Sequence, residues 1–266
     1  MEATREDRLG MDAGQLKPLR LSAVSYINAL PLLDGLAEDP ALVLELVPPA
    51  AAAEALLAGS ADAALVPVVT LLRDAALAPL GEGCIACDGA VDSVLVQLGT
   101  APHLVNRLAL DPESRSSQRL ASWLLATSHG TRPELRERAA PEPVIPADCD
   151  AGLVIGDRAL HVLLARKPVL DLGREWKRTT GFPFVFAVWA ARRDHPRRSE
   201  LVACLEAARQ RGSGRLDFHA QAAARQSGLP LATCAVYLGE RIRYRFDDAA
   251  AAGLGLFLEL VRQGAC

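Results

Sequence analysis

Three short stretches of the sequence place small polar residues directly after an apolar run. They are residues 25–31, 111–117 and 155–158, with the sequences SYINALP, DPESRSS and IGDR. In open α/β sheets, ligands bind beyond the carboxyl ends of strands, because loops and helix N-termini there offer unpaired backbone N–H groups. The three stretches therefore predict a small-molecule site where strands end and helices begin.

The first stretch contains one amide side chain, Asn28, shortly before Pro31. Proline suits the first turn of a helix and Asn is a common N-cap, so spacing alone favours a capping role for Asn28. The alternative role is functional, since a buried Asn at a cleft can both donate to and accept from a ligand. Ser25 and Tyr26 lie at the same predicted strand end.

The second stretch has the composition of an anion site. Three hydroxyls, one guanidinium and a helix N-terminus all favour a carboxylate or phosphate. An ordinary Ser N-cap beside a solvated Arg explains the same residues equally well. In the third stretch, Gly156 and Asp157 precede a helix, and a plain N-cap role for Asp157 is favoured. In the second stretch, the residues that suggest an anion site are Ser114, Arg115, Ser116 and Ser117.

Two further segments set polar residues among apolar ones. Gly89 suits a turn into a strand that starts near Ser93, whose hydroxyl taken alone is an ordinary strand hydroxyl. Thr180 and Gly181 come just before Pro183, and a glycine at that point lets the backbone pass close to a ligand.

Composition limits the classes of partner. The chain has 266 residues, of which 50% are apolar and 23% charged, with a formal net charge of -3. No long block of Lys or Arg occurs, so we expect neither nucleic acid nor an anionic membrane as a partner. The first 18 residues lack the apolar run of a secretory signal, which predicts a cytoplasmic protein. A homodimer is compatible with the sequence.

Cysteines and standard motifs give no evidence of a metal or nicotinamide site. Six cysteines are sparse for this length and mostly sit in apolar surroundings, so we expect free thiols. Cys84 and Cys87 have CxxC spacing, but no second pair completes a zinc site. The sequence contains no GxGxxG after the first strand, no Walker loop, no HExxH and no GxSxG.

Apolar periodicity alternates between short strands and amphipathic helices, which is typical of an α/β fold. A Pro-containing break at residues 101–103 marks a predicted lobe boundary. We expect the apolar strand at residues 182–193 to carry the chain back to the first lobe, and residues 199–266 to be helical. Other predicted strands are residues 19–26, 41–49, 62–68, 92–99, 107–111 and 151–157.

Residues 25–32, SYINALPL, resemble the SYxNxxPL motif of the chorismate dehydratases of the futalosine route to menaquinone. Residues 176–189 include TTGFPFVFAVW and are the most specific further match. The resemblance continues through the tail YLGERIRYRFDDAAAAGLGLF and covers residues 19–262. One departure is that relatives carry Ser and Glu where this chain has Val68 and Thr70. Matches in the same order and spacing also occur at residues 87–93, 114–117 and 154–157.

The resemblance implies a two-lobed periplasmic-binding-protein type II fold with a ligand cleft between the lobes. It places residues 19–100 with 184–266 in a discontinuous first lobe and residues 101–183 in the second. Residues 1–18 are expected to form a flexible N-terminal extension.

The resemblance also implies an activity, the removal of water from chorismate to give 3-[(1-carboxyvinyl)oxy]benzoate. No cofactor and no metal are implied, because the reaction makes the ring aromatic and the driving force lies in the substrate. Asn28 and Ser93 match the family's catalytic positions. Two alternatives stay open, a cytosolic solute-binding protein and the related enzyme of the same pathway that forms or processes cyclic dehypoxanthine futalosine. The implied substrate-binding residues are Ser25, Tyr26, Ser114, Arg115, Ser116, Ser117, Gly156, Asp157, Thr180 and Gly181.

Overall fold

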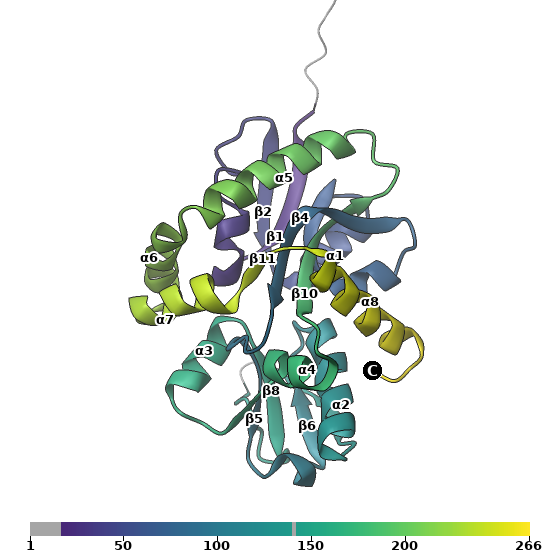
Figure 1. The fold of residues 1–266 in the computed structure, drawn as a ribbon, viewed down its shortest axis with the longest axis vertical. Helices are drawn as coiled ribbons and strands as arrows, with labels where there is room; N and C mark the ends of the chain where they lie inside the picture. The colour runs from purple at the N-terminus through teal and green to yellow at the C-terminus, as the bar shows by residue number, and fades with distance from the viewer. Residues whose placement is uncertain (1–16, 140–141) are drawn as a thin grey trace, which may run out of the picture.

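The chain folds into two lobes, each built on its own β-sheet (Figure 1). The computed structural model describes residues 17–139 and 142–266. The predicted α/β, two-lobed architecture is confirmed, and the chain passes between the sheets at residues 88–93 and again at residues 181–183. Most of the extension predicted at residues 1–18 lies outside the described residues.

The first lobe contains a six-stranded sheet with the order β11-β4-β10-β3-β1-β2. Strands β2, β1 and β3 are mutually parallel, whereas β10 runs antiparallel to both β3 and β4. Burial shows how this sheet is packed, since β3 is buried along most of its length while the edge strand β2 alternates between half-buried and exposed residues. The strands are β1 (Leu19–Val24), β2 (Leu42–Val47), β3 (Ala63–Pro67), β4 (Leu77–Cys87), β10 (Phe184–Arg192) and β11 (Arg243–Arg245).

Helices cover this sheet and fill the turns after its strands. Helix α1 begins at Pro49 and packs on β3 and β1, and α5 packs on β4 and the short 3₁₀ helix that follows β1. Gly59 follows α1 with a φ of +71°, a backbone conformation that glycine adopts without strain. The helices of this lobe are η1 (Ile27–Leu32), α1 (Pro49–Leu57), η2 (Val68–Leu72), α5 (Arg198–Ser213), α6 (Leu216–Ser227), α7 (Leu231–Val236), the π-helical turn η4 (Tyr237–Arg241) and α8 (Asp248–Arg262).

The second lobe contains a five-stranded sheet with the order β7-β6-β8-β5-β9. Strands β6, β7 and β8 are parallel, and β5 runs antiparallel to β8 and β9. Helix α2 buries one face, formed by Leu120, Ala121, Leu124 and Leu125. The elements are β5 (Val94–Leu98), η3 (Pro102–Leu104), β6 (Arg107–Leu110), α2 (Arg115–His129), β7 (Glu134–Glu137), β8 (Ala151–Ile155), α3 (Asp157–Leu164), β9 (Val169–Asp171) and α4 (Leu172–Thr180).

The first crossing between the lobes comes earlier than the sequence indicated. Strand β5 pairs with β8 and β9 in the second sheet, although the predicted boundary at residues 100 and 101 placed it in the first lobe. We therefore divide the chain at residues 88–93 and 181–183, where it leaves one sheet for the other. The apolar character of residues 94–98 does not show which of two sheets the strand joins, because that depends on distant pairing partners.

An aromatic cluster packs against the second crossing. Trp176 on α4 lies 5.2 Å from Phe184 on β10 and 6.0 Å from Phe257 on α8, measured between ring centroids. The Trp176 indole N–H donates a 3.1 Å hydrogen bond to the carbonyl oxygen of Pro183. Helix α8 passes so close to this carbonyl that a Cβ at Gly253 would lie 2.1 Å from it. The two lobes are therefore joined here by close packing.

No helix within residues 17–139 and 142–266 has the length and apolar content needed to cross a membrane.

Two glycines of α8 provide a matched test of this packing. Gly253→Ala should lower the free energy of unfolding by about 1–3 kcal/mol, because the new methyl group has no room beside Pro183. Gly255→Ala, two residues along the same helix in open space, should raise it by about 0.5–1 kcal/mol. Chemical denaturation of both variants measures the difference, and equal stabilities would contradict the close approach of α8 to the crossing.

Candidate active site

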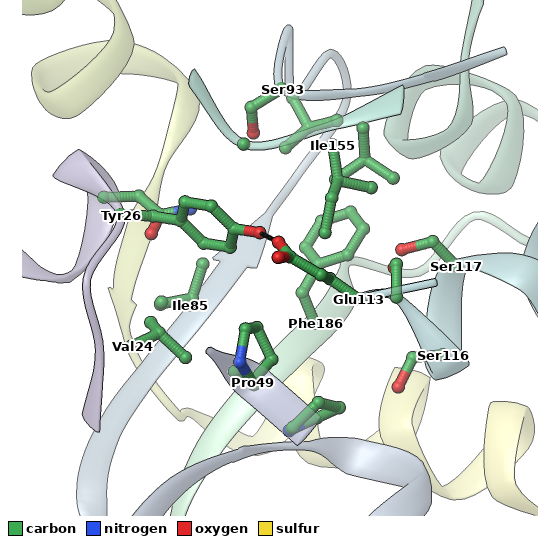
Figure 2. A pocket seen from close by; sticks show the side chains of 17 residues that line it. Val24, Tyr26, Pro49, Ile85, Ser93, Glu113, Ser116, Ser117, Ile155 and Phe186 are labelled. Carbon is green, nitrogen blue, oxygen red and sulfur yellow. Dashed lines mark hydrogen bonds between the residues drawn. The ribbon is translucent and has the colours of Figure 1, made fainter. Parts of the chain in front are cut away.

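A pocket lies between the two lobes and takes side chains from both (Figure 2). It encloses about 580 Å³ of space outside protein atoms, part of it open to solvent. Its walls are mainly apolar, and its polar groups come from strand ends and helix starts, where the sequence predicted a site. The lining residues are Val24, Tyr26, Asn28, Pro49, Pro67, Ile85, Val91, Ser93, Val94, Glu113, Ser114, Ser116, Ser117, Ile155, Gly156, Phe186 and Ala187.

Asn28 and Ser93 lie on this wall and are linked through a third residue, Tyr237. The Asn28 amide Nδ2 donates to the Tyr237 hydroxyl at 3.0 Å, and that hydroxyl donates to Ser93 Oγ at 2.7 Å. All three side chains are buried, with exposed fractions of 9%, 1% and 1%. The capping role considered for Asn28 is wrong, because Tyr26 occupies the N-cap position of η1 and Asn28 lies inside the helix.

The segment before Ser93 is held in an unusual backbone conformation. Asp92 has a φ of +62°, which is rare for a residue with a side chain. Its N–H donates to Asp171 Oδ2 at 2.8 Å, and its carboxylate accepts from Arg241 Nε at 2.7 Å. These contacts fix the crossing segment from both lobes, so the position of Ser93 follows from them.

Three hydroxyls face the pocket from the start of α2. Ser114 is the N-cap residue, but its side chain caps no backbone N–H, and Ser116 and Ser117 occupy the first turn of a 15-residue helix. The Ser116 hydroxyl also accepts from the backbone N–H of Val69 in the first lobe, at 3.4 Å. Hydroxyls together with the positive end of a helix dipole suit a carboxylate group.

Tyr26 and Glu113 meet across the mouth of the pocket, where the Tyr26 hydroxyl donates to Glu113 Oε2 (Figure 2). Tyr26 belongs to the first lobe and Glu113 to the second. Both residues also line a separate outer cavity, so the pair forms a wall between that cavity and the pocket. Burial, followed by the neighbouring Glu113 carboxylate, raises the pKa of Tyr26 well above its usual value, which keeps the phenol protonated as a donor.

Gly156 and Asp157 support Tyr26 from the second lobe. Gly156 has a φ of +63°, and a Cβ there would lie 2.8 Å from Cε1 of the Tyr26 ring. Gly156, not Asp157, is the N-cap residue of α3. The Asp157 carboxylate accepts from the backbone N–H of Ile27 at 3.4 Å, and burial raises its pKa. Glycine is required at 156 because both backbone conformation and space exclude a side chain.

Five of the ten predicted binding residues do not line this pocket. Ser25 lines the outer cavity instead, together with Asp157. Arg115 points to the surface, where Nη1 lies 3.4 Å from Glu54 Oε1. The Thr180 hydroxyl donates to the carbonyl of Trp176 at 2.9 Å, and Gly181 ends α4 with a φ of +78°. The TTGFPF stretch thus belongs to the crossing, and the first residue after it that lines the pocket is Phe186.

Two residues were not found by sequence reasoning: Glu113 on the pocket wall, and Tyr237, which binds Asn28 and Ser93. Glu113 lies within residues 111–117. It was not predicted as a site residue because the guanidinium and hydroxyl groups around it suggested that this stretch binds an anion. Tyr237 lies 209 residues from Asn28, in a tail whose pattern indicated only helices. The resemblance covered that tail without pointing to the tyrosine.

The CxxC pair is structural. Cys84 and Cys87 are both buried in β4 and are free thiols. Burial raises the pKa of Cys84 to about 12, so this thiol is unreactive near neutral pH.

Two β-sheet lobes joined by two crossings, with a pocket between them, define the class of proteins with a periplasmic-binding-protein-like fold. Residues 19–263 match a family model described as menaquinone biosynthesis, and the chain belongs to this family. The chain is also 34% identical, over 263 residues, to the chorismate dehydratase of Thermus thermophilus, covering 92% of this chain and 95% of that relative. The family resemblance seen in the sequence is thereby confirmed.

Solved structures of lower sequence identity support the fold. Protein AF1704 from Archaeoglobus fulgidus superposes with a TM-score of 0.75 at 15% identity, covering 94% of this chain and 98% of that one. The alkanesulfonate-binding protein SsuA from Xanthomonas axonopodis gives a TM-score of 0.66 at 18% identity, covering 94% and 93%. Both show the two-lobed architecture and nothing more about function.

Replacing Gly156 tests the support of Tyr26. Gly156→Ala should lower kcat/KM by about tenfold or more, because the added methyl group displaces the Tyr26 ring from the pocket wall. Gly228→Ala is the matched control, since it has a similar φ of +71° at the end of α6 but open space around it. Gly228→Ala should lose about 1–2 kcal/mol of stability from backbone strain. Gly156→Ala should lose more, because its ψ of −147° lies in a region that essentially only glycine adopts. Equal activities in steady-state kinetics would contradict the assigned contact.

Proposed function

We propose that this protein is a chorismate dehydratase, a carbon–oxygen lyase that releases water from chorismate to give 3-[(1-carboxyvinyl)oxy]benzoate. The observation that carries the proposal is the 34% identity to a chorismate dehydratase over 92% of the chain. The placement of Asn28 and Ser93 together on one interlobe pocket wall, as the resemblance predicted, agrees with it.

The reaction depends more on the alignment of the substrate with the proton-transfer groups than on a strong acid or base. A base takes the proton from ring carbon C3, the electrons of that C–H bond form a C3–C4 double bond, and the C4–O bond breaks. The departing hydroxide takes up a proton and leaves as water. Because the product ring is aromatic, the elimination is favourable once substrate and proton-transfer groups are aligned.

The pocket offers complementary surfaces for such a substrate. Val24, Ile85 and Phe186 provide apolar contact for the flat ring. Chorismate carries two carboxylates, and the hydroxyls at the start of α2, with the N-terminus of that helix, are suited to receive one of them. Arg115 is directed away toward Glu54, so we assign it no contact with substrate.

Asn28 and Ser93 are the groups we assign to the C4 hydroxyl. Asn28 Oδ1 is buried with no hydrogen-bond partner in the described chain, so it is free to accept the hydroxyl proton of the substrate. Ser93 is suited to donate to the departing oxygen as the C4–O bond breaks.

The base for C3 is assigned to the substrate itself. Glu113 is the one carboxylate among the described residues of the pocket wall, and its Oε2 is already held by the Tyr26 hydroxyl at the mouth. The enolpyruvyl carboxylate of chorismate is linked to C3 through the ether oxygen and one vinyl carbon, so it can reach the C3 proton, which then serves to convert hydroxide to water. Cytoplasmic location and a homodimer stay predictions, since nothing in the described chain tests them.

The direct test is to incubate the purified protein with chorismate and follow the products by chromatography with mass detection. We expect an aromatic product lighter than chorismate by one water. Chorismate that is bound, as shown by a thermal shift, but never converted would contradict the proposal and favour a solute-binding protein. Binding of a futalosine-type ligand with no effect of chorismate would favour the related enzyme.

Substitution of the two central polar residues tests their roles. Asn28→Asp and Ser93→Ala should each lower kcat by about tenfold or more. The first change replaces the amide donor to Tyr237 with a carboxylate whose negative charge lies beside the departing hydroxide, and the second removes the hydrogen bond to the leaving oxygen. Ser22→Ala is the control, since Ser22 is equally buried in β1 but lies outside the pocket wall. Circular dichroism checks that the variants are folded. Rates near that of the wild-type protein in both would overturn the assignment.

A further inference from the structure

Tyr237 occupies a position that the reaction alone does not explain. It begins the π-helical turn η4, between α7 and β11, and its side chain is fully buried. Turns of this type are rare and often occur at functional sites. The turn contacts the crossing segment at both of its ends, since Tyr237 binds Ser93 while Arg241 binds Asp92.

Each hydrogen bond in this cluster has a defined donor and acceptor. A phenol hydroxyl has one proton, which Tyr237 gives to Ser93 Oγ at 2.7 Å. Tyr237 accepts in turn from Asn28 Nδ2 at 3.0 Å. Ser93 therefore uses an acceptor lone pair within the cluster and keeps its own proton for another partner. Asn28 uses its N–H₂ group and keeps Oδ1, which is buried without a partner among the described residues.

We propose that Tyr237 is a positioning residue that orients Ser93 as a hydrogen-bond donor and Asn28 as an acceptor toward the substrate. The inference rests on the proposed function and deepens it. A leaving hydroxyl needs both kinds of partner, one that accepts its proton and one that donates to its oxygen. Tyr237 orients both Ser93 and Asn28 in advance, so neither side chain has to reorganise when the C4–O bond breaks.

The protonation state of Tyr237 agrees with its role as a donor. Burial, which is the largest influence, raises the pKa of Tyr237 well above its usual value, and its hydrogen bonds with Ser93 and Asn28 offset only part of that shift. The phenol accordingly stays protonated and remains a donor to Ser93.

A structural role for the hydroxyl makes a different prediction. If Tyr237 only satisfied buried polar groups, its removal would lower stability and leave the rate constant of the folded enzyme unchanged. A positioning role lowers kcat and has little effect on KM, because the ring and the substrate contacts remain in place.

The experiment is a double-mutant cycle on the full chain with chorismate as the probe. Tyr237→Phe should lower kcat by about tenfold or more while KM changes by less than about twofold. In the Ser93→Ala background, the same change should lower kcat by less than about threefold, because the residue through which it mainly acts is already missing. Tyr244→Phe is the matched control. The buried hydroxyl of Tyr244 has no hydrogen-bond partner among the described residues, and Tyr244 does not line the interlobe pocket. Its kcat should equal that of the wild-type enzyme.

Three outcomes would overturn the proposal. One is wild-type kcat in Tyr237→Phe, and another is an equal loss in the wild-type and Ser93→Ala backgrounds. The third is failure of Tyr237→Phe to fold even when combined with Gly255→Ala, because the hydroxyl would then have a structural role. Wild-type turnover of chorismate is measured first, so a failure of the proposed function is recognised separately from a failure of the role of Tyr237.

Discussion

The antiparallel pairing of β4 with β10 is the constraint on which the two-lobed structure depends. Cys87, the last residue of β4, pairs with Phe184, the first of β10, so both crossings leave the first sheet at the same place. The aromatic cluster around Trp176 and the close approach of Gly253 pack against the second crossing. The pocket between the lobes is lined in part by Ile85, Phe186 and Ala187 from the same two strands. The elements that join the lobes therefore also form part of the site.

The site takes its groups from parts of the chain that lie far apart in the sequence. Asn28 comes from the first strand end, Ser93 from the first crossing and Tyr237 from the C-terminal region. Tyr26 and Glu113 then bridge the lobes at the mouth. Closing the mouth lowers the local polarity, which strengthens each hydrogen bond to a departing hydroxyl. The fold resembles that of solute-binding proteins. We assign the elimination to Asn28 and Ser93, which Tyr237 links.

Sequence reasoning was most successful where local patterns determine structure. Strand ends followed by polar residues located the pocket wall around Asn28 and Ser116, because strand-to-helix junctions are local features. Strand β4 was missed, since Pro79, Gly81 and Gly83 weaken its strand pattern and its register shifts depend on β10. The role of Tyr237 could not be predicted, because it depends on a contact across 209 residues. The family resemblance supplied Asn28 and Ser93, which composition and spacing alone left ambiguous.

A crystal structure of the Ser93→Ala variant with chorismate would test the central claim, that the interlobe pocket holds the substrate with its leaving hydroxyl against Asn28. We predict the ring between Val24 and Phe186, with the C4 hydroxyl within about 3 Å of Asn28 Oδ1, the normal range for a hydrogen bond between oxygens. Chorismate in the outer cavity beyond Tyr26 and Glu113, or with its C4 hydroxyl directed away from Asn28, would contradict the account.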